Sequence, residues 1–223
     1  MFLGHYAAAL FAKRAVPSAS LGALVAAAQL PDLVWPVFLL IGWERVEVAP
    51  GATAFTPLAF LHYPWSHSLL LVSLWAGAAG LAARLRGRRS AIAAAVGALV
   101  VSHWLLDFVS HRPDLPLYPG GPLAGLGLWR SVPATLVLEL ALFGGAAALA
   151  LRSVLHPARV GRFAVAGFLG LLLLIYLANA AGPPPPSAPV VAWSALSLWL
   201  LVPWAGWLDR RGKVDETHPS RHT

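Results

Sequence analysis

The sequence predicts an all-α integral membrane protein, a bundle of about six to seven transmembrane helices. Of its 223 residues, 58% are hydrophobic and only 11% are charged, and the mean hydropathy is +0.70. A soluble domain has about 25% charged residues. Apolar runs close to the ~20 residues that span a bilayer also recur along the chain. We therefore expect one membrane domain over residues 1–208, followed by a polar cytoplasmic tail over 209–223.

Seven apolar segments carry this prediction: 2–13, 18–42, 66–84, 90–110, 132–151, 162–181 and 189–208. The first is short for a full span and is typical of a half-helix or an interfacial helix. The second contains Pro31 and Pro36. Because proline interrupts the helical hydrogen-bond ladder, we expect a broken helix that bends at Leu30-Pro31-Asp32. Four consecutive prolines at 183–186 predict a stiff connector between the last two spans.

The basic residues predict the orientation of the bundle. If the seven segments alternate in direction, 13 of the 16 Lys and Arg residues lie on one side of the membrane. Arg45, Arg112 and Arg130 lie on the other side. The larger set comprises Lys13, Arg14, Arg84, Arg86, Arg88, Arg89, Arg152, Arg159, Arg162, Arg210, Arg211, Lys213 and Arg221. Cytoplasmic loops are enriched in Lys and Arg, so we expect a cytoplasmic C-terminus. The net charge of +7 is dispersed over short loops, and therefore no nucleic-acid partner is expected.

His103, Asp107 and His111 form the most informative pattern, because they follow one another at four-residue intervals near the end of an apolar segment. This spacing places all three side chains on one helical face. Imidazole and carboxylate groups arranged in this way are typical metal ligands. The chain contains no cysteine, so a metal would be held by His, Asp, Glu and water. Ionisable residues at membrane depth are functional candidates.

Other ionisable residues fall at a similar depth. With a rise of ~1.5 Å per residue, they lie about 20 to 27 Å from the basic end of their segments. This group comprises Asp32, His67, His103, Asp107 and Glu139. His62 and His111 would lie just above it, and His5 about 12 Å above Lys13, less deep than the group. Two interpretations remain open: the groups pair with one another and hold the bundle together, or they form a metal site that opens to the outer face.

The segment from His62 to Ser68 places two histidines on either side of Pro64, so both imidazoles can point into one cavity. The alternative is an interfacial loop with aromatic residues at headgroup level. Ser66 is the expected N-cap of the following helix, with His67 in its first turn. Asp32 is either a metal ligand at the helix break or a simple helix cap.

Four further residues are candidates for catalysis or substrate binding. Glu139 is a candidate general acid or base, or else a buried partner for a histidine. Asp114, just beyond the helix that carries His103, is a second catalytic candidate or a loop residue. Arg112 and Arg130 lie on the outer side and suit a phosphate, although interfacial anchoring explains them equally well.

Four elements in order resemble the family of membrane-bound metal-dependent hydrolases typified by the YdjM inner-membrane protein. They are Gly4-His5, Leu30-Pro31-Asp32, His62-x4-His67-Ser68 and Ser102-His103-x3-Asp107, within residues 1–115. The arginine and glycine usual after the first histidine of the third element are absent. Val34 occupies the place of a second acidic residue that is frequent in the family.

The resemblance implies a bacterial inner-membrane hydrolase that binds a divalent metal, and zinc is the first candidate. The ligands it implies are His5, Asp32, His62, His67, His103 and Asp107, and the four-residue spacing adds His111 as a candidate. The family is itself distantly similar to zinc-dependent phospholipase C enzymes. The expected substrate is therefore a phosphoester of a lipid or of another membrane-associated molecule, cleaved by a metal-activated water.

Two other functions remain open. Pro64-Trp65-Ser66-His67 and His103-x3-Asp107 also echo the motifs of metal-independent lipid-phosphate phosphatases, although the arginine that precedes the histidine in those enzymes is absent. A transporter or a metal-binding membrane protein without catalytic activity would fit the same cluster, and the helix broken at Pro31 fits a transporter as well as it fits an enzyme.

Overall fold

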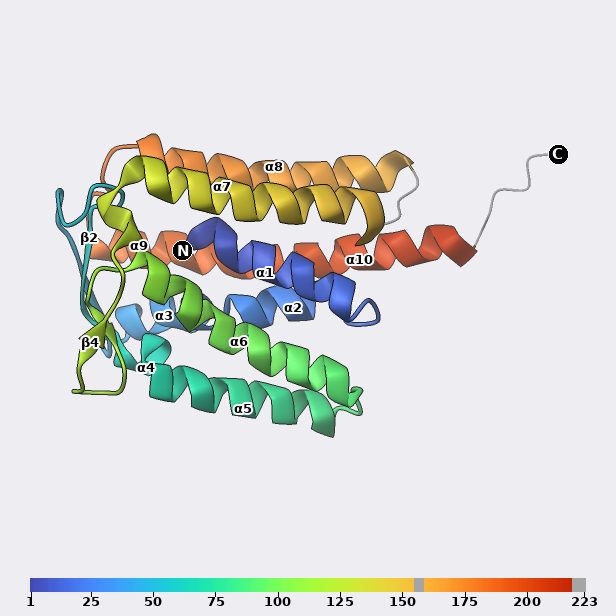
Figure 1. Ribbon diagram of the computed structural model, residues 1–223, viewed down its shortest axis with the longest axis horizontal. Coiled ribbons are helices and arrows are strands. Elements are labelled where there is room, and N and C mark those ends of the chain that lie inside the picture. Colours follow the sequence, from blue (N-terminus) through green and yellow to red (C-terminus); the bar gives the residue numbers. More distant parts are fainter. Residues whose placement is uncertain (155–158, 218–223) are drawn as a thin grey trace.

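The computed structural model describes residues 1–154 and 159–217, with side chains placed for 1–152 and 163–209. It is a helical bundle capped at one end by two short β-hairpins (Figure 1). In chain order the elements are α1 Phe2–Ala15, α2 Leu21–Ala28, α3 Leu30–Leu40, β1 Arg45–Val48, β2 Leu58–His62, α4 Pro64–His67, α5 Leu69–Leu85, α6 Ser90–Ser110, β3 Leu115–Pro116, β4 Leu123–Ala124, η1 Leu128–Arg130, α7 Val132–Leu149, η2 Ala150–Val154, α8 Arg159–Ala181, α9 Ala188–Leu196, η3 Ser197–Leu200 and α10 Leu201–Thr217.

Within these residues, four helical stretches are long and apolar enough to cross a membrane, and the bent pair of α2 and α3 makes up to five. The four are Ser90–Ser110, Val132–Arg152, Phe163–Ala181 and Ala188–Asp209. The expected number of six to seven is not confirmed. Helix α1 has 14 residues and α5 has 17. At ~1.5 Å per residue they reach about 21 and 26 Å, short of the ~30 Å hydrocarbon core.

The broken second segment is confirmed. Helices α2 and α3 meet at an angle of 56°, with Gln29 between them. The break therefore precedes the expected Leu30-Pro31-Asp32. Proline lacks an amide hydrogen, and the first turn of a helix does not need that donor, so α3 starts just before Pro31. Asp32 consequently lies in the first turn of α3, beside the end of α2.

Helix α1 lies inside the bundle and contacts α2, α6 and α7 (Figure 1). Leu3, His5, Tyr6 and Ala9 are all at most 1% exposed. A helix enclosed by other helices does not have to match the thickness of the bilayer, which explains how an apolar segment of 14 residues is accommodated. This position also carries His5 into the protein interior.

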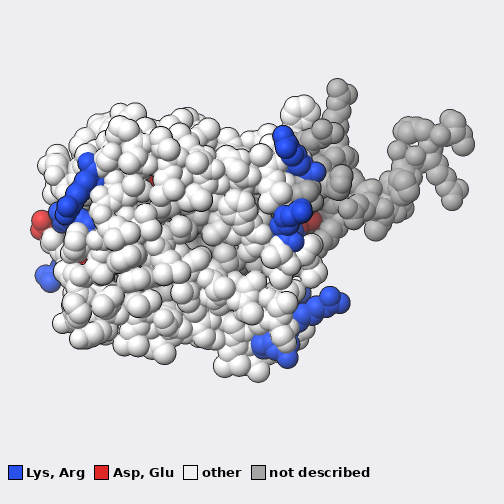
Figure 2. Space-filling view, viewed as in Figure 1, with Lys and Arg blue, Asp and Glu red and all other residues white. Residues whose placement is uncertain are grey.

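Both hairpins lie at the end of the bundle where α6 and α8 finish and α9 begins (Figure 1). β1 and β2 are antiparallel, as are β3 and β4. Prolines 183–186 form the non-helical connection from α8 to α9 at this end, as expected. Figure 2 shows Lys and Arg side chains at the two ends and an uncharged band between them on the visible face. The side chains of Arg159, Arg162, Arg210, Arg211, Lys213 and Arg221 lie outside the described part.

The polar segment that starts at Asp209 begins within a helix, because α10 continues to Thr217. Asp209 is 6% exposed and its carboxylate lies 2.5 Å from Nζ of Lys13. Lys13 also donates to the carbonyls of Pro17 and Ala19. This buried pair ties the end of α1 to α10.

Helix α2 packs on α10 at a point where only glycine fits. A Cβ on Gly22 would lie 2.8 Å from the carbonyl oxygen of Val202 and 2.9 Å from the amide nitrogen of Gly206. Because these are backbone atoms, they cannot rotate away.

We predict that Gly22→Ala lowers the unfolding midpoint of the purified protein, since overpacking costs about 1–3 kcal/mol. Gly77→Ala is the matched control, because nothing lies within 4 Å of its added Cβ. Equal midpoints for the two variants would contradict this packing.

Candidate metal centre

Three histidines and two aspartates meet in the interior, supplied by four helices. His5 comes from α1, Asp32 from α3, His67 from α4, and His103 with Asp107 from α6. They form two groups, and within each group the potential ligand atoms lie within 4.8 Å of one another. One group is His5, His103 and Asp107; the other is Asp32, His67 and His103. His103 belongs to both groups. Such buried His/Asp groups have the composition and spacing to hold a metal ion.

The ligand atoms converge on a small volume. Nε2 of His103 lies 3.1 Å from Asp107 Oδ2 and 3.8 Å from Asp32 Oδ1. Nε2 of His67 lies 3.4 Å from Asp32 Oδ1 and 3.8 Å from Asp107 Oδ2. Nε2 of His5 lies 3.2 Å from Asp107 Oδ1, and the amino group of Met1 also contacts that oxygen. All three imidazoles thus present Nε2 to the two carboxylates.

A backbone carbonyl orients His103. Its Nδ1 lies 2.8 Å from the carbonyl oxygen of Ala28, the last residue of α2. A carbonyl only accepts, so Nδ1 carries the proton of this hydrogen bond. The last carbonyls of a helix have no intrahelical donor, and the break at Gln29 therefore makes this acceptor available. In the neutral ring, Nε2 then presents a lone pair to the aspartates.

Nε2 of His103 is completely buried and forms no hydrogen bond, even though Asp107 lies 3.1 Å away. A nitrogen lone pair facing carboxylate oxygens in an apolar interior is unfavourable without a cation between them. A metal ion would remove this conflict. The alternative is a proton on Nε2, which would make the contact an ion pair.

His67 is oriented by a side-chain relay. The hydroxyl of Ser66 donates to Glu44 Oε2 at 2.6 Å and lies 2.6 Å from His67 Nδ1. The single hydroxyl proton is directed to Glu44, so the oxygen accepts from Nδ1 and leaves Nε2 free for the site. The amide of Ser66 also donates to Glu44, at 2.8 Å. Ser66 is therefore not the expected N-cap of the following helix; Ser68 accepts from the amide of Leu71 and caps α5.

Sequence reasoning missed Glu44. Its side chain is 1% exposed and it lies between α3 and β1, 22 residues before Ser66. Burial raises the pKa of the Glu44 carboxyl above its ordinary value. No periodicity connects a loop residue to a helix so far along the chain. The one available signal was that Glu44 is an acidic residue in a sequence that contains few acidic residues.

His5 completes the cluster from the opposite side. Its ring stacks on that of His103, with centroids 3.7 Å apart and an interplanar angle of 6°. Its Nδ1 is buried without a hydrogen-bond partner. Close stacking of two imidazoles disfavours a positive charge on both rings at once, and the neutral form of a histidine is the one that binds metals.

His62 and His111 lie apart from the five clustered residues. His62 is exposed at the end of β2, opposite Arg45. Helix α6 ends at Ser110, and His111 has an extended backbone, so it leaves the face that carries His103 and Asp107. Its Nδ1 lies 3.0 Å from Asp114 Oδ1 and 3.2 Å from the hydroxyl of Tyr63.

The other predicted site residues divide between two places. Nε of Arg112 donates to Asp114 at 2.9 Å, and Arg130 is exposed. Burial opposes ionisation of Asp114, but hydrogen bonds from His111 and Arg112 lower the pKa of its carboxyl. Glu139 instead lies near the cluster. Its Oε2 accepts from the amide of Leu3 at 2.7 Å, and Oε1 is buried without a partner.

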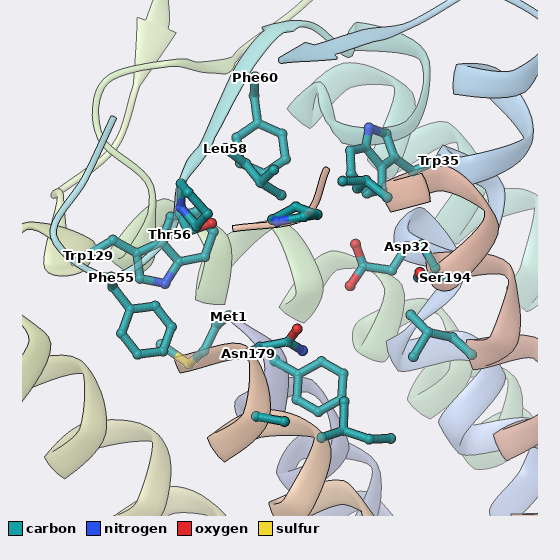
Figure 3. A pocket seen from close by; sticks show the side chains of 18 of the residues that line it. Met1, Asp32, Trp35, Phe55, Thr56, Leu58, Phe60, Trp129, Asn179 and Ser194 are labelled. Atoms are coloured by element: carbon teal, nitrogen blue, oxygen red, sulfur yellow. The ribbon is translucent and has the colours of Figure 1, made fainter. Parts of the chain in front are cut away.

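A cavity of about 480 Å³ opens onto the cluster (Figure 3). Asp32, His67, Asp107 and Glu139 line its polar side. Its walls are largely aromatic and apolar and include Trp35, Phe55, Phe60 and Trp129. His111 also lines it, whereas Arg112, Asp114 and Arg130 do not. Concave apolar sites with a few converging polar groups are typical of ligand pockets.

No family model, curated protein or solved structure matches this chain.

The two histidines around Pro64 provide a test of the cluster. We predict that His67→Ala lowers zinc affinity by more than the roughly 10–100-fold typical of losing an outer-shell partner. His62→Ala is the matched control and should bind zinc like the wild type, because its side chain lies at the surface. Competition against a fluorescent zinc chelator measures both affinities. Equal affinity of His67→Ala and wild type would contradict the ligand assignment.

Proposed function

We propose that this protein is a membrane-embedded, metal-dependent hydrolase of a phosphoester in a lipid or another membrane-associated substrate. The observation that carries the proposal is the unpaired Nε2 of His103, held toward two carboxylates beside an open cavity. Ligands and cavity are both needed for such an enzyme, because the metal must contact protein groups and substrate together.

The donor set favours zinc as the metal. Three imidazoles and two carboxylates are borderline ligands of the kind that zinc binds, and the chain offers no thiolate. The groups behind the ligands are also typical of a metal site: the carbonyl of Ala28 fixes the ring of His103, and Ser66 with Glu44 fixes that of His67. When bound, the metal would supply a water of lowered pKa and neutralise charge on a phosphoryl oxygen.

The residues around the cluster suit the remaining steps. Asp32 has the most accessible side chain of the cluster, at 25% exposed, and so marks the side from which substrate approaches. Glu139 lines the cavity and its Oε1 has no hydrogen-bond partner, so its carboxyl group is a candidate to accept or return a proton. Arg112 is engaged by Asp114, so both are better assigned to shaping the rim than to binding a phosphate.

The resemblance to the YdjM-like hydrolases supports the same proposal, because five of its motif residues meet in the cluster: His5, Asp32, His67, His103 and Asp107. It also supports a location in a bacterial inner membrane. The cavity lies at the end of the bundle opposite Arg84 and Arg89, and the positive-inside rule then directs it to the outer face.

Metal content and turnover together test this function. We predict that purified protein hydrolyses a phosphodiester lipid, that a chelator stops the reaction and that added zinc restores it. His103→Ala should lose both metal and activity. Glu139→Gln should keep the metal and lose about 10²–10⁴-fold in turnover, the range expected for a general acid or base. His62→Ala should retain both.

Other outcomes would identify the competing functions. Turnover that survives complete removal of the metal would indicate a metal-independent phosphatase. A bound metal without hydrolysis of any phosphoester lipid would favour a transporter or a metal-binding protein. Equal metal content in the wild type and His103→Ala would show that a proton, not a metal, joins His103 to Asp107.

A further inference from the structure

We propose that the cavity takes an amphiphilic ester that enters from the membrane between α8 and α9, with its apolar chain along these helices and a head that carries at most one negative charge. This inference rests on the proposed function and specifies its substrate: a diester in place of a monoester. It depends on which residues line the cavity and where it meets the surface.

One wall of the cavity is largely apolar and is formed by the end of α8 and by α9 with η3. Ile175 and Ala178 line it from α8, and Val191, Ala195 and Leu198 line it from the other side. These side chains offer no hydrogen bonds to a polar ligand. They suit a hydrocarbon chain, since burial of apolar surface contributes roughly 25 cal/mol per Å².

The same wall contains the opening. Ala178, Asn179 and Ser194 line the cavity and are also exposed at the surface of the protein. Figure 3 shows Asn179 below Asp32 and Ser194 beside it. α9 packs on α3, whereas α8 packs on α10 and α1, so the two helices have different supports. The exposed lining residues therefore place the opening of the cavity at α8 and α9, and we call the surface between these helices the seam.

The surface beside this seam is suited to lipid. Leu177 on α8 is 43% exposed and Trp193 on α9 is 65% exposed. Both helices lie in stretches long and apolar enough to cross a membrane. Large apolar side chains at a span surface face acyl chains, so a molecule that approaches the seam from the bilayer would present its chain first.

The charges at the inner end restrict the head. The lining contains three carboxylates, Asp32, Asp107 and Glu139, and no Lys or Arg among the described residues. The amino group of Met1 is already paired with Asp107. A phosphate monoester carries about −1.5 to −2 charges near neutral pH. Its second charge would have to be neutralised by the metal alone, in a site of low dielectric that already holds carboxylates. A diester brings a single charge.

Because the chain contains no cysteine, single cysteines can report on the cavity without removing any other thiol. Ala195→Cys places one in the apolar wall. Leu174→Cys is the control, because Leu174 is 63% exposed on α8 and does not line the cavity. Both variants are zinc-loaded, held in an amphipol polymer and labelled with a small maleimide. Unchanged metal content and unfolding midpoint verify that each variant is folded.

The added probes are dodecylphosphocholine, dodecyl phosphate and glycerophosphocholine, all below micellar concentration. We expect dodecylphosphocholine to slow labelling of Ala195→Cys at least fivefold and to leave Leu174→Cys unchanged. Dodecyl phosphate, with its second charge, and glycerophosphocholine, without a chain, should protect much less.

No protection of Ala195→Cys, or equal protection of both cysteines, would overturn the proposed binding of the chain. Equal protection by dodecyl phosphate would overturn the restriction on charge. Labelling measures binding without turnover, so protection without hydrolysis of the lipid would contradict the proposed function and leave the ligand class intact. Hydrolysis of the lipid without protection of Ala195→Cys would support the proposed function and contradict the proposed binding of the chain.

Discussion

The hydrogen bond from His103 to the carbonyl of Ala28 is the contact on which the candidate site depends. It exists because the second apolar segment breaks at Gln29, where α2 ends and α3 turns away by 56°. The break supplies an acceptor that a continuous helix would have used itself. It also places Asp32 in the first turn of α3, within reach of the histidines. One irregularity in the backbone thus orients a histidine and positions an aspartate.

The apolar character of the bundle gives this arrangement its significance. Charged groups in a low-dielectric interior must be paired, and an unpaired one costs several kcal/mol. In the cluster, two aspartates face three imidazoles. Nδ1 of His67 is hydrogen-bonded to Ser66, and Nδ1 of His103 is hydrogen-bonded to the carbonyl of Ala28. With neutral rings, the Nε2 lone pairs of His67 and His103 would therefore face carboxylate oxygens. A bound cation, held at the mouth of a cavity, is the simplest physical reason for retaining such an arrangement.

Much of the cluster followed from the sequence. Helical spacing related His103 to Asp107, and depth along each segment brought Asp32 and His67 to the same level; all four meet in the structure. The same reasoning extended the pattern to His111, but α6 ends one residue earlier and the backbone becomes extended. Spacing along a helix cannot show where the helix stops. His62 likewise lies on the exposed end of a hairpin strand that the hydropathy pattern did not reveal.

The membrane depth estimated from the helical rise also underestimated the role of α1. Counting from Lys13 placed His5 above the basic end but too shallow for the cluster, whereas the helix is enclosed by α2, α6 and α7 and reaches Asp107. Glu44 could not be found at all, because its contact with Ser66 depends on the turn between α3 and β1. The expected six to seven spans were not confirmed for a related reason: apolar composition predicts burial, and much of α1 is buried against neighbouring helices.

X-ray absorption at the zinc edge of the purified protein can establish whether the buried His/Asp cluster holds zinc. We expect a first shell of nitrogen and oxygen only, at the ~2.0–2.2 Å typical of zinc ligands, with the outer-shell scattering of at least two imidazole rings. Because the chain contains no cysteine, a sulfur shell is not expected. A spectrum of fully hydrated zinc, without imidazole scattering, would contradict the assignment of the buried His/Asp cluster as a metal centre.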